Sequence, residues 1–335
     1  SEIIPSSVTP TSVPQNQVHT PSKVVTVQDT VTLTLPISPS STATPAATSV
    51  PNLTPSQEGT SYLALGYYTG SQESFDALLA FSAYLDIVSV DVYSVQADGS
   101  IAGSDDPGAA AYAQAHGIET YACVSNYNTD PVVDDFDAQL AHTAITTHKD
   151  RLISGLVALA QDGGYDGINI DIENLAYSAN IEDDRAYFSS FIHDLSAQLH
   201  ANGIRLMISV PGKTIDSIDN TWAYPFDLAA LGQDADYLQL MTYDQHGPWG
   251  DPGPVSGADW MENCVAYASS LVDPARLLIG LPAYGYDWDL AASDPGNGIY
   301  SATSFSWTEI PALLAKPEAV VYWDEGSSSP YLTYH

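Results

Sequence analysis

Residues 61–335 predict an α/β fold built as a (β/α)8 TIM barrel, with a doubly wound open sheet as the structural alternative. Near-continuous apolar runs of strand length alternate with helical patterns, and polar or aromatic side chains gather where those runs end. A doubly wound nucleotide-binding sheet carries a Gly-rich phosphate loop after its first strand. The segment YYTGSQES, at the end of the first run, has a single Gly, and this favours the barrel.

Seven strands and the helices between them follow in order along this segment. The expected strands span, by residue number, 62–68, 85–95, 117–127, 164–175, 204–211, 236–244 and 276–286. Between the fourth and fifth strands, apolar side chains recur at helical spacing at Phe188, Phe191, Ile192, Leu195 and Leu199. Asn202-Gly203 then supplies a helix stop.

The eighth strand of the barrel is missing from this order. Residues 287–335 end in AVVYWDEGSSSPYLTYH, two aromatic-rich runs around a turn, which predicts a hairpin. We interpret 287–335 as an insertion after strand seven, and the barrel as truncated before strand eight. Because an incomplete barrel exposes strand edges, we expect the natural chain to continue past His335, or residues 1–60 or the hairpin to fill the gap.

Residues 1–60 differ from the rest in composition. They are rich in Ser, Thr and Pro, as in PISPSSTATPAATSVPNLTPS. Such a segment buries too little apolar surface to offset the entropy of ordering it, and we interpret it as a disordered linker or stalk of the kind found on exported proteins. The stretch 24–37 alternates like a strand, and a small upstream module is the less favoured alternative.

The chain is strongly acidic. It has 41 Asp plus Glu against 8 Lys plus Arg, a formal net charge of −33. This charge repels phosphate backbones, so nucleic acid is excluded as a partner. No apolar run is long enough to span a membrane, so no membrane insertion is expected. The chain starts at Ser without a signal peptide, and we interpret it as a mature or trimmed form, or a fragment.

The two cysteines are Cys123, in a strand-like run, and Cys264, in a helix-like run. We expect two buried free thiols, although their spacing leaves one long-range disulfide open. No metal-ligand cluster is visible in the sequence.

The fourth strand, GYDGINIDIENL at 164–175, alternates Ile with Asn169, Asp171 and Glu173. Side chains two apart point the same way and lie about 6.6 Å apart along a strand. In a barrel this face points to the axis, so Glu173 stands at the mouth with Asp171 beneath it. A crowded, negative and partly desolvated carboxyl has a raised pKa and suits general-acid protonation of a glycosidic oxygen. A polar barrel layer satisfied by hydrogen bonds is the alternative.

Other strands also end in polar or aromatic residues: Tyr67, Tyr68, Asn126, Tyr127, Lys213, Tyr243, Asp244, Tyr284, Tyr286 and Trp288. The carboxyl ends of barrel strands converge on one mouth, where active sites lie. We therefore expect substrate contacts from Tyr67 and Asn126. Tyr286 and Trp288 are candidates for the wall or lid of the site, with ordinary packing as the alternative.

Three motifs resemble those of glycoside hydrolase family 18, the chitinase-like barrels. DGINIDIE resembles the signature D-x-x-D-x-D-x-E, MTYDQHG resembles the sixth-strand motif Met-x-Tyr-Asp, and GLPAYGYDW resembles the seventh-strand motif. The resemblance covers 61–335 in matching strand order. It is closest to the bacterial branch of spore-cortex and cell-wall N-acetylglucosaminidases.

The resemblance implies roles residue by residue. Glu173 falls on the catalytic acid/base, and Asp171 on the carboxylate that orients the substrate's 2-acetamido group. Tyr243 falls on the hydroxyl that holds the acetamido oxygen, and Asp244 on a neighbouring substrate contact. Asp166 opens the signature and is a further substrate-binding candidate.

Two departures from the family pattern matter. Asn169, also a substrate-binding candidate, sits at the second acidic position of the signature, which removes one ionisable group below Asp171. In the family, the eighth strand brings a Trp to the sugar-binding subsite. That strand is absent here, and no residue of this chain can be assigned the role.

The resemblance implies retaining, substrate-assisted hydrolysis of β-1,4-linked N-acetylglucosamine glycans, with no metal or cofactor. A non-catalytic, lectin-like barrel is the alternative, and a structural or adhesive surface protein is a third. The resemblance points to peptidoglycan, while chitin or a glycoprotein glycan stays open. We expect a monomer that is extracellular or associated with the cell surface or cell wall, with a polysaccharide containing N-acetylglucosamine as its partner.

Overall fold

The computed structural model describes residues 62–334 of the chain. The chain divides into two units, Ser1–Tyr62 and Leu63–His335. The predicted linker over 1–60, with the strand-like stretch 24–37, lies outside the described residues. Within 62–334, no helix combines the length and apolarity that a membrane span requires.

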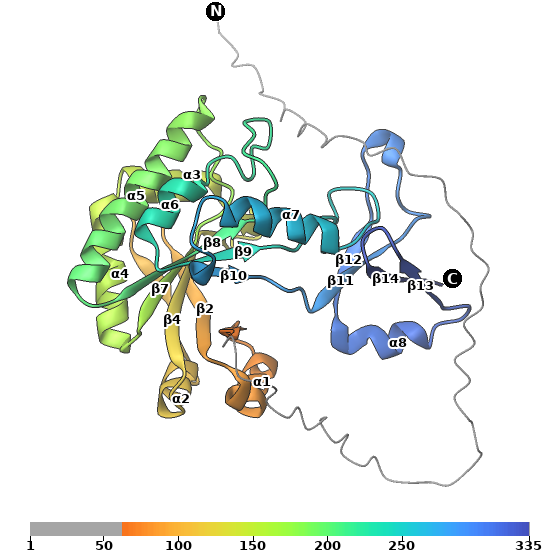
Figure 1. The fold of residues 1–335 in the computed structure, drawn as a ribbon, viewed down its shortest axis with the longest axis horizontal. Helices are drawn as coiled ribbons and strands as arrows, with labels where there is room; N and C mark the ends of the chain where they lie inside the picture. The colour runs from red at the N-terminus through yellow and green to blue at the C-terminus, as the bar shows by residue number, and fades with distance from the viewer. Residues whose placement is uncertain (1–61, 335) are drawn as a thin grey trace, which may run out of the picture. The chain divides into compact units, whose positions relative to one another are not determined.

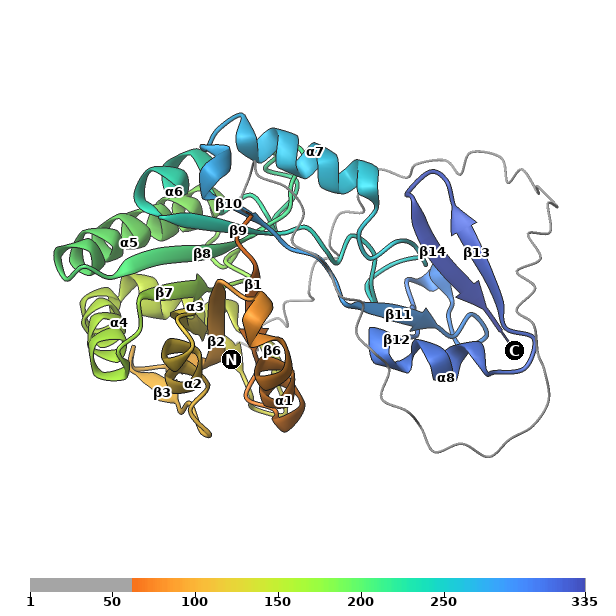
Figure 2. The same cartoon turned by 60° about the horizontal axis from the view of Figure 1, so that its bottom comes forward.

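A curled parallel sheet forms the centre of the second unit (Figure 2). Its strands, in hydrogen-bonded order, are β1 Leu65–Tyr68, β2 Ile87–Val95, β4 Glu119–Ser125, β7 Gly167–Asp171, β8 Arg205–Pro211, β9 Tyr237–Met241 and β10 Leu277–Ile279. All neighbours on this path run parallel, and the short β3, Ile101–Gly103, pairs antiparallel with β2. Among the described residues no strand joins β10 back to β1, so the sheet is a half-barrel with two free edges.

Helices follow the strands and pack around the sheet (Figure 1). They are α1 Gln72–Phe81, α2 Ala109–Ala115, α3 Ala138–Thr146, α4 Lys149–Gly163, α5 Ile181–Ala201, α6 Leu228–Asp234 and α7 Ala258–Ser269, with single 3₁₀ turns at Ser82–Tyr84 and Pro274–Arg276. A small hairpin, β5 Tyr127–Asn128 with β6 Asp135–Phe136, lies between β4 and α3. The strand–helix alternation confirms the predicted barrel class.

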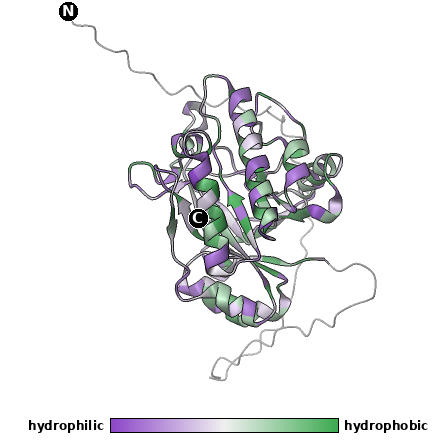
Figure 3. Ribbon diagram, turned by 90° about the vertical axis from the view of Figure 1, so that its left-hand side faces the viewer, coloured by the Kyte–Doolittle hydropathy of each residue, from purple (hydrophilic) through white to green (hydrophobic). Residues whose placement is uncertain are grey.

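The long helix α5 shows how the sequence pattern sets the core. Asn180 caps its first turn by accepting a hydrogen bond from the backbone N–H of Glu182, and Gly203, with a φ of 70°, permits the left-handed turn that ends it. The five apolar side chains predicted on one face are all fully buried: Phe188, Phe191, Ile192, Leu195 and Leu199. Figure 3 shows hydrophobic green along the strands and green mixed with purple along the helices, as expected for amphipathic helices on a buried sheet.

Truncation of Phe188 tests this packing. Its ring lies 5.3 Å from that of Phe226 and 6.4 Å from that of Phe191, measured between centroids, with no solvent exposure. Because Phe188→Ala leaves a cavity, we expect the free energy of unfolding to fall by about 3–5 kcal/mol, measured by urea unfolding. Gln198→Ala, on the exposed side of the same helix, should change it by less than about 0.5 kcal/mol. Equal effects of the two changes would contradict the packing.

The seventh strand is shorter than predicted. β10 ends at Ile279, and Tyr284–Trp288 forms a separate strand, β11, which pairs antiparallel with β12, Ala302–Ser306. The prediction of one continuous strand over 276–286 is therefore wrong. Pro282 lies in the break, and it has no N–H to donate to a sheet ladder.

The chain after β10 forms a small lobe of two hairpins (Figure 1). After β11 and β12 come α8 Ile310–Leu314 and the pair β13 Val320–Asp324 and β14 Ser329–Thr333, with 3₁₀ turns at Pro295–Asn297 and Trp307–Glu309. The pairing of β13 with β14 confirms the predicted C-terminal hairpin, and β11, which lies partly within the predicted seventh strand, pairs with β12 of this lobe. The carbonyl of Ser327 accepts a hydrogen bond from the backbone N–H of Ala258 at 2.9 Å, which ties this lobe to the start of α7.

Candidate active site

The acidic side chains of the fourth predicted strand gather at β7 and the turn after it. Asn169 and Asp171 lie on β7, and Glu173 follows two residues beyond its end. Their positions alternate with fully buried Ile residues of the core. Asn169 is fully buried and Glu173 is 7% exposed. The predicted polar face therefore exists, and it points away from the helix-covered side of the sheet.

Asp166 lies at the opposite end of β7. Its carboxylate accepts hydrogen bonds from the backbone N–H of Thr120 at 2.8 Å and from the Thr120 hydroxyl at 3.3 Å, and it is exposed. Glu173 lies seven positions further along the chain, a span of about 23 Å in extended conformation. The structure does not bring Asp166 to the site, and it ties β7 to β4 instead.

Asn169 is the centre of a buried polar layer beneath the carboxyls. Its side-chain amide donates to the Tyr67 hydroxyl and to Ser89 Oγ, both at 3.1 Å, and approaches Cys123 Sγ at 3.5 Å. Its Oδ1 accepts from Ser209 Oγ at 3.3 Å. The Tyr67 hydroxyl is engaged in this layer below the mouth. Cys123 is a buried free thiol, and so is Cys264.

Asn126 holds the backbone of Glu173. Its Oδ1 accepts from the Glu173 N–H at 2.8 Å, and its Nδ2 donates to the Glu173 carbonyl at 2.9 Å and to the Asp137 carbonyl at 3.1 Å. It is fully buried, so its amide is occupied by the protein itself. The structure places this predicted substrate contact as the clamp that fixes the Glu173 turn.

Asp171 is a buried carboxyl with a raised pKa. Burial, and next the neighbouring carboxyl of Asp91, raise the pKa of Asp171 to about 7, while a hydrogen bond from Ser209 acts in the opposite direction. Its Oδ1 is buried and has no hydrogen-bond partner in the described part of the chain. A buried acceptor without a partner is costly, so this oxygen is available to a ligand.

Glu173 also has a raised pKa. Burial is the main cause of a pKa well above the usual range for a glutamate, and the nearby carboxyls of Asp171, Asp244, Asp135 and Asp91 add to it. Within residues 62–334, no lysine, arginine or histidine forms an ion pair with Glu173 or Asp171. Burial and this negative surrounding shift the pKa of Glu173 upward, in the direction that a general acid requires.

Asp91 is a site residue that sequence reasoning missed. It lies on β2, beside Cys123 of β4 in the parallel register, just before a β-bulge between Asp91 and Tyr93. Burial raises its pKa, although a hydrogen bond with Cys123 lowers it in part. The signal was present, because Ser89 and Asp91 interrupt the apolar first half of the strand at a spacing of two.

Tyr243 and Asp244 follow β9 at the mouth. An added Cβ at Gly280 would lie 2.5 Å from the Tyr243 ring, so glycine leaves the room that this ring occupies. Burial, and then the charges of Asp171 and Glu173, raise the pKa of the Tyr243 hydroxyl, which stays protonated as a hydrogen-bond donor. The structure thus brings Tyr243 together with the carboxyls of Asp171 and Glu173.

Asp244 is held by the C-terminal lobe. The hydroxyls of Tyr284 and Tyr286 on β11 both donate to its Oδ1, at 2.6 and 2.8 Å. Its backbone φ is 58°, and Asn174, directly after Glu173, has a φ of 53°. Left-handed backbone is costly for most residues and tolerated best by Asn and Asp, and it often marks functional turns.

The remaining predicted aromatics belong to a row on the lobe side of the mouth. Trp288 Nε1 donates to the Gly250 carbonyl at 3.1 Å, and its ring lies 5.8 Å from that of Tyr286. Trp249, which the sequence did not single out, lies 6.1 Å from Tyr286 and is 61% exposed. An exposed indole in such a row offers a flat apolar surface suited to a sugar ring.

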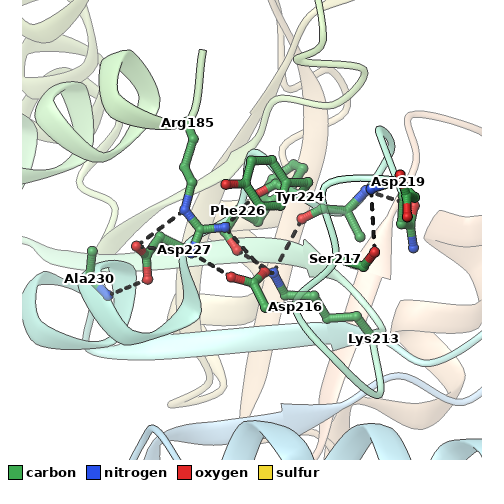
Figure 4. Close-up of polar contacts among 11 residues, drawn as sticks. Arg185, Lys213, Asp216, Ser217, Asp219, Tyr224, Phe226, Asp227 and Ala230 are labelled. Atoms are coloured by element: carbon green, nitrogen blue, oxygen red, sulfur yellow. Dashed lines mark hydrogen bonds and ion pairs between the residues drawn. The ribbon is translucent and has the colours of Figure 1, made fainter. Parts of the chain in front are cut away.

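Lys213, two residues after β8, binds groups of the loop before α6 (Figure 4). Its buried ammonium contacts Asp216 at 2.7 Å and the carbonyls of Phe226 and Ala223 at 2.7 and 3.3 Å. Arg185 from α5 pairs with Asp216 at 2.8 Å and with Asp227 at 3.0 Å. Both cations form their ion pairs with Asp216 and Asp227. Neither of them neutralises the carboxyls of Asp171 and Glu173.

The arrangement suits acid catalysis at a buried site. Glu173, with its raised pKa, and Asp171, with a free oxygen, lie on the same face, and the Tyr243 hydroxyl lies beside them. In the described part of the chain, no group of three or more His, Cys, Asp or Glu residues could hold a metal ion. The residues present supply a proton donor, a carboxylate and a hydroxyl donor.

Known proteins share this sequence and this fold. The model of glycosyl hydrolases family 18 matches residues 70–335. The chain is 34% identical over 274 residues to the uncharacterized glycosylase YvbX of Bacillus subtilis, covering 81% of this chain and 76% of the relative. A solved chitinase from Chromobacterium violaceum has a TM-score of 0.72 at 36% identity, covering 82% of each chain. The cortical fragment-lytic enzyme of Bacillus subtilis is 25% identical over 188 residues, which are 56% of this chain and 42% of that enzyme. The chain therefore belongs to glycosyl hydrolases family 18 and is a glycoside hydrolase.

Proposed function

We propose that this enzyme cleaves β-1,4-linked N-acetylglucosamine glycans with retention, using the substrate's own acetamido group. The observation that carries the proposal is the pair formed by Glu173, whose pKa is raised well above its usual range, and Asp171, whose buried Oδ1 has no hydrogen-bond partner among the described residues. An acetamido N–H is a donor that would satisfy this oxygen. A substrate without that amide would leave it unpaired.

The reaction follows from these positions. Glu173 gives its proton to the glycosidic oxygen while the acetamido oxygen attacks the anomeric carbon, which forms an oxazolinium ion and releases the leaving sugar. Ionised Asp171 accepts the acetamido N–H and stabilises the positive charge. Glu173, now a carboxylate, takes a proton from water as the water opens the ring, and the product keeps the β configuration.

The polymer is proposed to be that of a cell wall, peptidoglycan first and chitin second. Support for peptidoglycan comes from the relatives in Bacillus, one of which is named for lysis of cortical fragments, and support for chitin comes from the chitinase at 36% identity. The net charge of −33 disfavours anionic polymers, but salt screens this long-range repulsion. Both polymers lie outside the cytoplasm, so we propose that the enzyme acts outside the cell or at its wall. We also propose that it acts as a monomer.

Product stereochemistry tests the proposal. We expect the wild-type enzyme to release the β-anomer first from N-acetylglucosamine oligomers or from purified peptidoglycan, as followed by proton NMR. The better substrate identifies the polymer. Early α-anomer would contradict substrate assistance, and bound glycan without any product would favour a lectin-like barrel.

A further inference from the structure

Asp91 stands in the same layer of the half-barrel as Asn169. In the parallel register, Asp91 pairs with Cys123, and Cys123 pairs with Asn169. The three side chains therefore follow one another across β2, β4 and β7. Asp171 lies one step higher on β7, where Ser125 is its register partner.

Hydrogen bonds join this layer through the thiol. The Asn169 amide nitrogen, whose two protons go to Tyr67 and Ser89, approaches Cys123 Sγ at 3.5 Å, and the Cys123 thiol hydrogen-bonds with Asp91. Because the Asn169 amide nitrogen offers the thiol no acceptor, the S–H proton is free to point at Asp91. An aspartate at position 169 would compete with Asp91 for that one proton.

The groups around Asp91 are acidic or neutral. Ser89 lies on its own strand, Tyr67 reaches the layer from β1, and Cys123 is on β4. Asp171 ends β7, and Glu173 lies two residues beyond it. Within residues 62–334, no lysine, arginine or histidine forms an ion pair with Asp91. Two carboxyls that share such a site cannot both ionise freely.

We propose that Asp91 is a positioning residue of the hydrolase, a carboxyl supplied from β2 in place of the ionisable group that Asn169 lacks. The proposal rests on the function proposed above. With the shared proton on Asp91, Asp171 is ionised and able to accept the acetamido N–H. With the proton on Asp171, its free oxygen no longer accepts the acetamido N–H as a carboxylate. The pair of carboxyls therefore sets the pH range in which the enzyme is active.

The pH profile of Asp91→Asn tests this role. Removing the neighbouring charge lowers the pKa of Asp171, so we expect the acid limb of kcat/KM to move down by about one pH unit. Ser89→Ala, which loses an uncharged contact with Asn169 in the same layer, should leave both limbs in place. The double change Asp91→Asn with Asn169→Asp returns a carboxyl to the layer and should restore the wild-type limb. An unmoved limb in Asp91→Asn would overturn the proposal.

A titration of the unmodified protein separates this inference from the proposed function. Carbon-13 NMR of the aspartate carboxyls in the full chain should show Asp91 and Asp171 titrating together in two steps, whether or not any glycan is cleaved. Two independent single-step curves would overturn the inference and leave the hydrolase proposal standing. Coupled titration without hydrolysis would overturn the hydrolase proposal and leave only the coupling of Asp91 with Asp171 standing.

Discussion

Glu173→Gln should lower kcat by about three orders of magnitude while the protein stays folded and still binds glycan. General acid catalysis by a positioned group contributes about 10²–10⁴ to a rate, and the amide keeps the shape of the side chain but has no proton to give. Asn126 holds the backbone of this residue rather than its carboxyl, so the turn is unaffected by the change. Steady-state kinetics on N-acetylglucosamine oligomers measure the loss, and calorimetry measures the binding.

Glu182→Gln is the matched control for this change. Glu182 is exposed in the first turn of α5 and loses the same charge, so kcat should stay within about twofold of wild type. A Glu173→Gln enzyme with more than a tenth of wild-type kcat would show that another group supplies the proton. Asp244 and Asp135 are the nearby carboxyls to test next.

The parity of the fourth strand is enough to predict the site's central pair. In GYDGINIDIENL the alternation with Ile fixes which side chains share a face, and the structure places Asp171 and Glu173 accordingly. The same arithmetic shows why Asp166 is elsewhere, because it lies an odd number of residues before Asp171 and at the far end of the strand. A motif that spans a whole strand includes residues at both of its ends.

Two other residues show what a sequence pattern leaves undecided. The sequence does not distinguish an amide at a strand end that contacts substrate from one that binds backbone groups. Asn126 binds backbone groups. Asp91 lies in a mostly apolar strand, and the groups that its carboxyl meets depend on which strand lies beside it. Register across β2, β4 and β7 is a property of the folded sheet.

The C-terminal lobe shows the limit for longer-range structure. Local alternation predicted the hairpin of β13 and β14, because its pairing is between neighbours in sequence. The break at Pro282 was readable in principle, since proline removes a ladder donor. The sequence does not predict the hydrogen bonds from Tyr284 and Tyr286 to Asp244, because these depend on the direction in which β11 leaves the sheet.

The second large effect is expected at Asp171. Asp171→Asn should lower kcat by about 10²–10³, the usual loss for one preorganised group that stabilises developing charge, with a small change in KM. The neutral amide cannot balance the oxazolinium charge. The exposed Asp183→Asn, with the same charge change on α5, should leave kcat within about twofold.

The pH profile of Asp171→Asn gives the sharper test, because the two limbs of kcat/KM respond differently. In the wild type, Asp171 has a pKa raised to about 7, so it is protonated below that pH and the rate falls on the acid side. The amide has no proton to gain, and that limb should disappear. The charge of Asp171 also helps to raise the pKa of Glu173, so without it Glu173 loses its proton at lower pH and the basic limb should move down. A profile that keeps both wild-type limbs would mean that Asp171 neither titrates in this range nor faces Glu173, and the reaction would need another carboxylate beside the acetamido group.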